Sequence, residues 1–259
     1  SVYAVTSHKR GGKPRTIHVL SRGSVLAPAH EALPGALAAV EALPARFDLP
    51  PDHAEGDRRV ALARWLASPD NPLTWRSIVN RVWQHHFGRG IVASPGDFGR
   101  MGAEPTHPEL LDRLATEFRD GGGSLKSLHR LIVTSATYRQ ASGVREECAA
   151  VDADDAYLWR QHRRKLEAEA VRDAVLAAAG TLDLAMGGPG WRDFKIEHPE
   201  HSPHYRYDLA DPEDASTWRR GVYRFVVRSQ TQPFMTCLDC ADPSMRVEKR
   251  NESISALQS

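Results

Sequence analysis

The sequence predicts a mainly α-helical fold with a small β element. Helical periodicity recurs from Asp57 to Ala179, where apolar residues return every three or four positions between helix-capping residues. Two regions instead combine β-branched and aromatic residues: an N-terminal pair of short runs, Tyr3–Val5 and Thr16–Leu20, and the segment Gly221–Arg228. We therefore expect an N-terminal hairpin and a strand at 221–228, both attached to a multi-helix body.

Prolines and glycines divide the chain into two predicted parts. Residues 1–55 contain the turn-forming cluster Lys9–Pro14 between the two N-terminal runs, followed by a proline-rich connector. Because proline lacks the N–H group that a helix interior needs, this connector is not expected to form a long helix. The helical domain is expected at 56–259. The chain starts inside a strand-like run and stops at an apparent helix start, so we expect an excerpt of a longer protein.

Five helices are predicted from capping residues and apolar periodicity. Their expected starts are Asp57, Pro72, Thr106, Ser124 and about Tyr157. Gly88 is expected to end the second helix, since glycine readily takes the left-handed conformation found at helix C-termini. Thr106 and Glu109 have the spacing of a capping box. The fifth helix is predicted to be the longest, reaching Ala179.

Composition excludes several classes of protein. The 259 residues include 34 Lys+Arg and 33 Asp+Glu, a net charge of +1, whereas a generic nucleic-acid binder carries a strong basic excess. No apolar run approaches the roughly 18 residues needed to span a bilayer. We therefore expect no nucleic-acid partner and no membrane span in this segment.

The three cysteines, Cys148, Cys237 and Cys240, are too few for a disulfide framework. Cys237 and Cys240 have the spacing of a redox pair or a metal half-site. Ala241 follows them, where a c-type haem site has histidine, so we expect no haem bound to this chain. A reactive pair and two small buried side chains both stay open as interpretations.

The most specific signal in the chain is the motif NPLTWRSIVNRVWQHHFGRG at 71–90. Shorter matches follow: DFG at 97–99, PTHPELLD at 105–112, LHRLIVTSATYRQ at 128–140, RRKLEAEAVRD at 163–173 and RRGVY at 219–223. Together these segments closely resemble a planctomycete-type domain of unknown function that lies at the C-terminal end of large proteins with a planctomycete-type cytochrome c domain. The resemblance covers roughly residues 57–259.

The resemblance implies an exported bacterial protein, periplasmic or extracellular. It implies an upstream domain of the same polypeptide as partner, and haem c on another domain of the full-length protein. It implies no assigned reaction, and it places the last helices of the family beyond the end of this chain. Because fold alone does not give function, candidate activities must come from side chains.

Four polar residues are candidate catalytic residues: Asn80, Arg81, His85 and His107. The first three lie on the polar side and flank of the helix predicted at 72–87, where they are expected to line a cleft. His107 lies at the start of the next helix. The helical period turns His86 towards the core instead. The structural alternative is that the four residues cap neighbouring loops.

Three histidines in the irregular stretch 191–220 form the most metal-like cluster: His198, His201 and His204. Their spacing of three suits polyproline II, whose three-residue turn puts the rings on one side. One such turn advances roughly 9 Å, whereas zinc holds its nitrogen ligands at about 2 Å. Metal binding therefore requires the loop to fold back or a carboxylate to join. A solvated or partner-facing loop is the alternative.

The same stretch contains four aromatic residues: Trp191, Tyr205, Tyr207 and Trp218. Aromatic faces beside Asp and Arg side chains are typical of sugar-binding clefts, because the C–H faces of sugars stack on rings. A long irregular loop is also uncommon unless it is functional or disordered. Core packing beneath the loop is the structural alternative.

Three functional hypotheses remain. The leading one is the C-terminal domain of a larger exported, cytochrome c-associated protein that acts on carbohydrate or in redox chemistry. The second is a non-catalytic scaffold that binds its upstream domain or another partner. The third is a metal-dependent hydrolase built on the three histidines. The sequence does not decide whether the chain is an enzyme.

Overall fold

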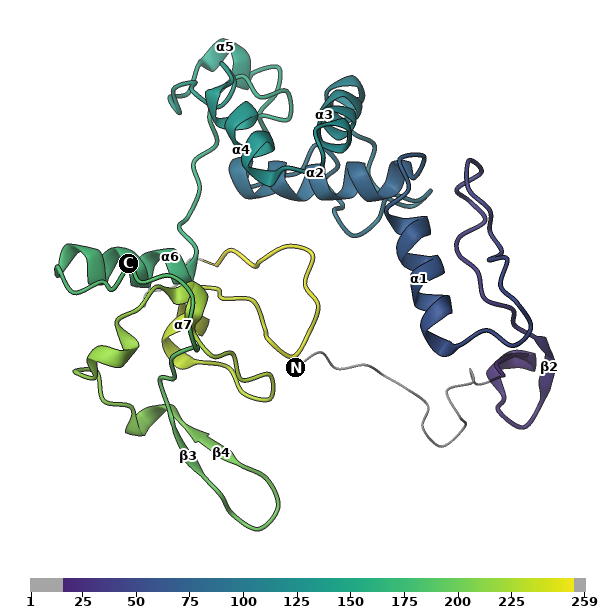
Figure 1. The fold of residues 1–259 in the computed structure, drawn as a ribbon. Helices are drawn as coiled ribbons and strands as arrows, with labels where there is room; N and C mark the ends of the chain where they lie inside the picture. Colours follow the sequence, from purple (N-terminus) through teal and green to yellow (C-terminus); the bar gives the residue numbers. More distant parts are fainter. Residues whose placement is uncertain (1–15, 254–259) are drawn as a thin grey trace. The chain divides into compact units, whose positions relative to one another are not determined.

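The computed structural model describes residues 16–253 and confirms the mainly α-helical fold with a small β element (Figure 1). The chain divides into two compact units, unit 1 at 1–162 and unit 2 at 163–259. The boundary predicted between 55 and 56 lies inside unit 1. No helix in the described residues is long and apolar enough to cross a membrane.

Unit 1 holds most of the helices. They are α1 (Glu55–Leu66), α2 (Pro72–Phe87), α3 (Pro108–Asp120), α4 (Leu125–Thr134) and the short α5 (Glu146–Ala149). Its core forms where α2 packs against α3 and α4, because each of these helices carries its apolar residues on one face. The rings of Trp83 and Phe87 stack 4.2 Å apart in this core. The other buried side chains there include Val79, Leu111, Leu114, Phe118, Leu128 and Ile132.

Local capping explains why α2 has the predicted bounds. The Asn71 carboxamide oxygen accepts the N–H groups of Leu73 and Thr74, at 3.1 and 3.4 Å, so two groups without helical partners are satisfied. Gly88 ends the helix with φ of 79°, the left-handed conformation expected of it. Ser124 caps α4 in the same way, by accepting the N–H of Ser127.

The capping box predicted before α3 is wrong. Helix α3 begins at Pro108 after His107, which makes no side-chain cap hydrogen bond. The Thr106 hydroxyl is used elsewhere, because it donates to the carbonyl of Ile91 at 3.3 Å and lies 2.9 Å from His107 Nδ1. Thr106 therefore fixes the loop between α2 and α3 and does not cap α3.

The N-terminal region forms a hairpin in different strands from those predicted. Strand β1 (His18–Leu20) lies within the predicted run Thr16–Leu20, and it pairs antiparallel with β2 (Pro28–Glu31). The segment assigned to the connector thus contains a strand. The run Tyr3–Val5 and the turn Lys9–Pro14 lie outside the described residues.

The long helix predicted from Tyr157 to Ala179 is wrong in its first half. Helix α6 spans only Ala168–Ala178 and ends two residues before Gly180. Asp155 and Leu158 have φ of 51° and 59°, which a helix cannot contain. The Asp155 carboxylate accepts the N–H of Trp159 at 2.8 Å, so a side chain replaces the helical hydrogen bond.

Unit 2 is built on α6, α7 (Pro233–Cys237) and a hairpin of β3 (Lys195–Glu197) and β4 (His204–Arg206). The strand predicted at 221–228 is wrong: Gly221–Tyr223 form a 3₁₀ turn, followed by one isolated bridge from Arg224 to Trp191. The Gly221 N–H donates to the Asp173 carboxylate on α6 at 2.7 Å. A Cβ at this glycine would meet the Glu169 Cβ at 3.1 Å, so only glycine fits easily against α6. This tertiary contact overrides the local strand preference.

Candidate functional site

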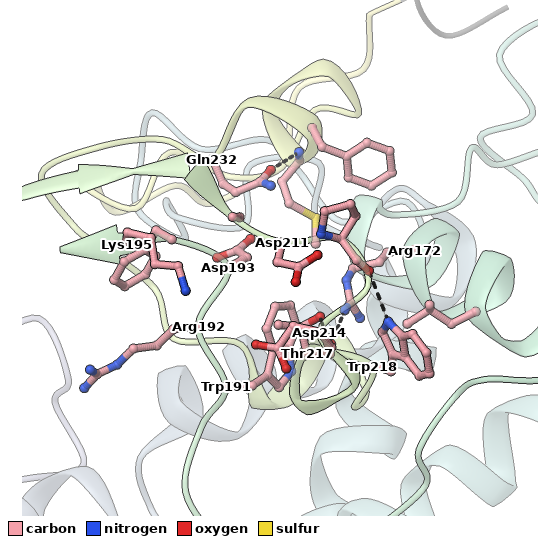
Figure 2. Close-up of a pocket in the computed structure, with 16 residues that line it drawn as sticks. Arg172, Trp191, Arg192, Asp193, Lys195, Asp211, Asp214, Thr217, Trp218 and Gln232 are labelled. Carbon is pink, nitrogen blue, oxygen red and sulfur yellow. Dashed lines mark hydrogen bonds between the residues drawn. The ribbon is translucent and has the colours of Figure 1, made fainter. Parts of the chain in front are cut away.

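A pocket of about 320 Å³ lies within unit 2 (Figure 2). Helix α6, the segment 191–195, the segment 210–218 and the start of α7 contribute its walls. This volume is within the range of small-ligand pockets. The pocket brings together side chains that lie up to 63 positions apart, from Arg172 to Met235.

Trp191 and Arg172 form a fixed part of the pocket. Trp191 is buried, and its indole N–H donates to the Arg220 carbonyl at 3.1 Å. The Arg172 guanidinium lies 4.1 Å from the centre of the indole ring, and it donates to the carbonyls of Arg219, at 2.9 Å, and Thr217. Burial lowers the pKa of Arg172, although Asp173 opposes the shift. One face of Trp191 is therefore covered by a guanidinium that is itself occupied with backbone carbonyls.

Asp193 is the half-buried carboxyl group of the pocket. Its Oδ1 is shielded from solvent and has no hydrogen-bond partner among residues 16–253. Burial raises the pKa of Asp193, against the opposing effects of the Arg224 charge and a hydrogen bond from Gln232. Asp193 therefore keeps its proton to a higher pH than an ordinary carboxyl group, and it can then donate a hydrogen bond.

Two further carboxylates surround the same pocket but are exposed. Asp211 accepts the N–H of Glu213, and Asp214 accepts the N–H of Ser216, both at 2.9 Å. Hydrogen bonds from the Ser216 side chain and backbone lower the pKa of Asp214. Asp193 and Asp214 thus line one pocket with pKa values displaced in opposite directions.

The predicted aromatic cluster divides into two groups. Trp191 and Trp218 line the pocket, and the half-buried Trp218 donates its indole N–H to the Pro212 carbonyl at 3.3 Å. Tyr205 and Tyr207 instead pack edge-on against the buried Phe194, at 5.2 and 5.5 Å. The partly exposed Phe234 completes the apolar wall. Trp218 and Phe234 therefore supply the ring surfaces that the pocket can offer to a ligand.

The three predicted metal ligands lie on the hairpin of unit 2. His204 begins β4, whereas His198 and His201 lie in the turn between β3 and β4, and all three are exposed. Across residues 16–253, no three His, Cys, Asp or Glu side chains group as metal ligands would. A metal at these histidines stays a prediction.

The four predicted catalytic residues belong to unit 1 and none of them lines the pocket of Figure 2. Asn80 is completely buried, and its carboxamide donates to the Val92 carbonyl at 3.0 Å and accepts the Val92 N–H at 2.9 Å. Arg81 and His85 are exposed on α2, and His107 lies next to Thr106. Arg81 lines a second, more apolar pocket of about 780 Å³. Their catalytic role stays a prediction.

Cys237 and Cys240 of unit 2 form no disulfide, and Cys240 takes part in a hydrogen-bonded cluster. No disulfide joins the three cysteines of the chain, all of which lie in the described part. The Cys240 thiol donates to the Glu169 carboxylate at 3.6 Å, and Arg250 binds that carboxylate at 2.7 and 3.0 Å. Burial raises the pKa of Cys240, so its reactive thiolate form is disfavoured.

The sequence did not identify Arg172, Asp193 or Asp214 as site residues. Arg172 lies in the segment RRKLEAEAVRD at 163–173, but that segment carries no assigned role, and Asp193 and Asp214 lie in no motif. The available signal was the long irregular stretch that contains most of the pocket. No curated protein and no solved structure matches the chain. Residues 58–259 match the family described as PSD1, "Protein of unknown function (DUF1553)". This match covers most of the chain, which therefore belongs to the PSD1 (DUF1553) family.

Proposed function

We propose that the pocket of unit 2 binds a neutral saccharide. The observation that carries the proposal is the combination, in one pocket, of two carboxyl groups with oppositely displaced pKa values and the ring of Trp218. Sugars present C–H faces that stack on indole and hydroxyl groups that both donate and accept hydrogen bonds. The carboxylate oxygens of Asp211 and Asp214 accept such bonds, and Asp193, whose pKa is raised by burial, donates one when it carries its proton.

The charge pattern favours a neutral ligand over an anionic one. Three cationic residues, Arg172, Arg192 and Lys195, line the pocket together with three aspartates. The guanidinium of Arg172 is committed to the carbonyls of Thr217 and Arg219. With a glycoside bound, Asp193, whose pKa is raised by burial, is the group suited to give its proton to the bridging oxygen as that bond breaks. Asp214, whose pKa is lowered, balances the developing positive charge, and water adds to the sugar carbon.

The wider setting of this activity follows from the family resemblance. In our proposal the chain works within a larger exported protein, next to an upstream domain and a haem c on another domain. If the saccharide is a redox substrate of that larger protein, adding it to the full-length protein reduces the haem. An unchanged haem spectrum across a panel of sugars would remove the redox link and leave the binding pocket.

The non-catalytic scaffold is the second candidate for unit 1. It is supported by Asn80, whose whole carboxamide is used to hold the backbone of Val92. If variants of Arg81, His85 and His107 folded normally but abolished turnover in the full-length protein, the scaffold interpretation would be wrong.

Replacing Trp218 by alanine is expected to weaken saccharide binding about tenfold, the loss of about 1.4 kcal/mol of ring stacking. Calorimetric titration of the full chain measures the change. The matched control is Tyr157→Ala, which removes an exposed ring of unit 1 and leaves affinity unchanged. Equal affinities for the parent and the Trp218 variant would place the sugar elsewhere.

Replacing Asp193 by asparagine is expected to weaken saccharide binding while stabilising unit 2 at pH 7. Because the folded state raises the pKa of Asp193, it binds the proton more tightly than the unfolded chain does. Stability is therefore lost as pH rises from the ordinary carboxyl pKa of 3.8 through the raised value. Asparagine carries no ionisable proton, so the variant does not lose this stability as the pH rises.

Hydrogen exchange at the amides of 191–194, measured from pH 4 to pH 7, follows the local stability. The parent chain should lose protection towards pH 7 more than the variant does. A variant that is less protected than the parent at pH 7 would mean that the folded state favours ionised Asp193, against the acid role assigned to it.

A further inference from the structure

Two histidines of unit 1 meet where α2 packs against α4. The Nε2 atom of His86, near the end of α2, lies 2.7 Å from the Nδ1 atom of His129 on α4. The ring centres are 5.0 Å apart with planes inclined at 69°. His86 is half-buried and His129 is exposed, so solvent reaches the pair from one side.

The core beneath the pair fixes its geometry. His86 precedes the buried Phe87, and His129 follows the buried Leu128. The Tyr138 ring stands edge-on to His86 at 5.5 Å and to Phe87 at 5.8 Å. The two imidazoles therefore project from packed helices, with their backbones held apart at a set distance, unlike a chance meeting of long surface side chains.

The separation of the two nitrogen atoms is close to that of two ligands on one metal ion. Imidazole nitrogens bind first-row metals at about 2.0–2.1 Å. Two such nitrogens are about 2.9 Å apart at a right angle and about 3.3 Å apart in a tetrahedron. The observed 2.7 Å is nearest to the right-angled geometry preferred by Cu²⁺ and Ni²⁺, and both rings must turn so that their nitrogen lone pairs point at the ion instead of along the line between the two nitrogens.

We propose that His86 and His129 form a two-histidine site for a divalent first-row transition metal ion. Cu²⁺ binds most tightly in the order expected for nitrogen ligands, and water completes its coordination on the exposed side. The ion replaces the hydrogen that now links the two rings, and it ties α2 to α4. This site belongs to unit 1, whereas the histidines of the β3–β4 hairpin and the saccharide pocket belong to unit 2.

The test is a Cu²⁺ titration of the full chain carrying His198→Ala, His201→Ala and His204→Ala, so that the hairpin histidines do not contribute. Electron paramagnetic resonance with spin-echo detection counts the imidazoles bound to Cu²⁺. We expect one tight Cu²⁺ per chain with two bound imidazoles. Adding His129→Ala should leave at most one imidazole bound to Cu²⁺ and weaken Cu²⁺ binding by about tenfold or more.

Two controls keep the result unambiguous. His30→Ala removes an exposed histidine from β2 and should change neither the affinity nor the imidazole count. Because His129 is exposed, its replacement leaves the core of unit 1 intact, and circular dichroism verifies this. Unchanged Cu²⁺ affinity and imidazole count after His129→Ala would overturn the proposal and leave the pair as an N–H···N hydrogen bond only.

Discussion

Replacing Asp155 by alanine is expected to destabilise unit 1 by about 3–5 kcal/mol, the usual cost of removing one partner of a buried ion pair. The Asp155 side chain is only 1% exposed, and its Oδ2 lies 3.0 Å from His162 Nε2 and 3.6 Å from Arg160 Nε. The opposite nitrogen of His162 lies 2.7 Å from the Phe87 carbonyl at the end of α2. The Asp155 carboxylate thus lies between His162 and Arg160, and the Asp155 carbonyl, 3.1 Å from His162 Nε2, helps to hold the histidine that contacts the core helix.

Urea unfolding of the full chain measures this loss. Asp154→Ala is the matched control, because Asp154 is exposed and should cost no more than about 0.5 kcal/mol. Asp155→Asn keeps an acceptor for the Trp159 N–H and removes the charge, so we expect an intermediate loss. If Asp155→Ala were as stable as Asp154→Ala, the ion pair would contribute nothing to the fold.

Replacing Asn80 by alanine is expected to cost about 2–4 kcal/mol, because it leaves a buried N–H and a buried carbonyl of Val92 without partners. The backbone packs closely around the Asn80 side chain: a Cβ at Gly90 would lie 2.5 Å from the Val92 oxygen and 2.7 Å from Asn80 Nδ2. Thermal unfolding of the full chain measures the loss.

The neighbouring exposed residue gives the control. Arg81→Ala should change stability by less than about 0.5 kcal/mol. An Asn80→Ala variant that unfolds like the parent chain but lacks activity would contradict the structural role and support the predicted catalytic one.

Features encoded by neighbouring residues were predictable from the sequence. The bounds of α2 follow from Asn71, Pro72 and Gly88, which cap or start a helix by interactions within a few positions. The start of α4 at Ser124 follows the same rule. These residues act on backbone groups a few positions away, so their effect can be predicted from the local sequence alone.

Features set by distant residues were not predictable. The segment before α6 has helical periodicity, but His162 bonds to Phe87, 75 positions away. The segment 221–228 has strand-like composition, but Gly221 bonds to Asp173, 48 positions away. In both places the tertiary contact stabilises the observed conformation by more than the local secondary-structure preference opposes it. The two partners lie too far apart in the sequence for a local pattern to reveal the contact.

The candidate site shows the same division. The aromatic richness of 191–220 predicted a binding region, and two of its four rings do line the pocket. Asp193 could not be recognised from the sequence, because its raised pKa results from burial, and burial depends on the three-dimensional fold. Arg172 gave none because it reaches the pocket from α6.

The most direct test of the proposed function is calorimetric titration of the full chain with a panel of neutral mono- and oligosaccharides, repeated with Asp193→Asn and Trp218→Ala. We expect at least one saccharide to bind at one site per chain, with weaker binding in both variants. Absence of binding by every saccharide, or binding that both variants retain unchanged, would contradict a saccharide pocket in unit 2.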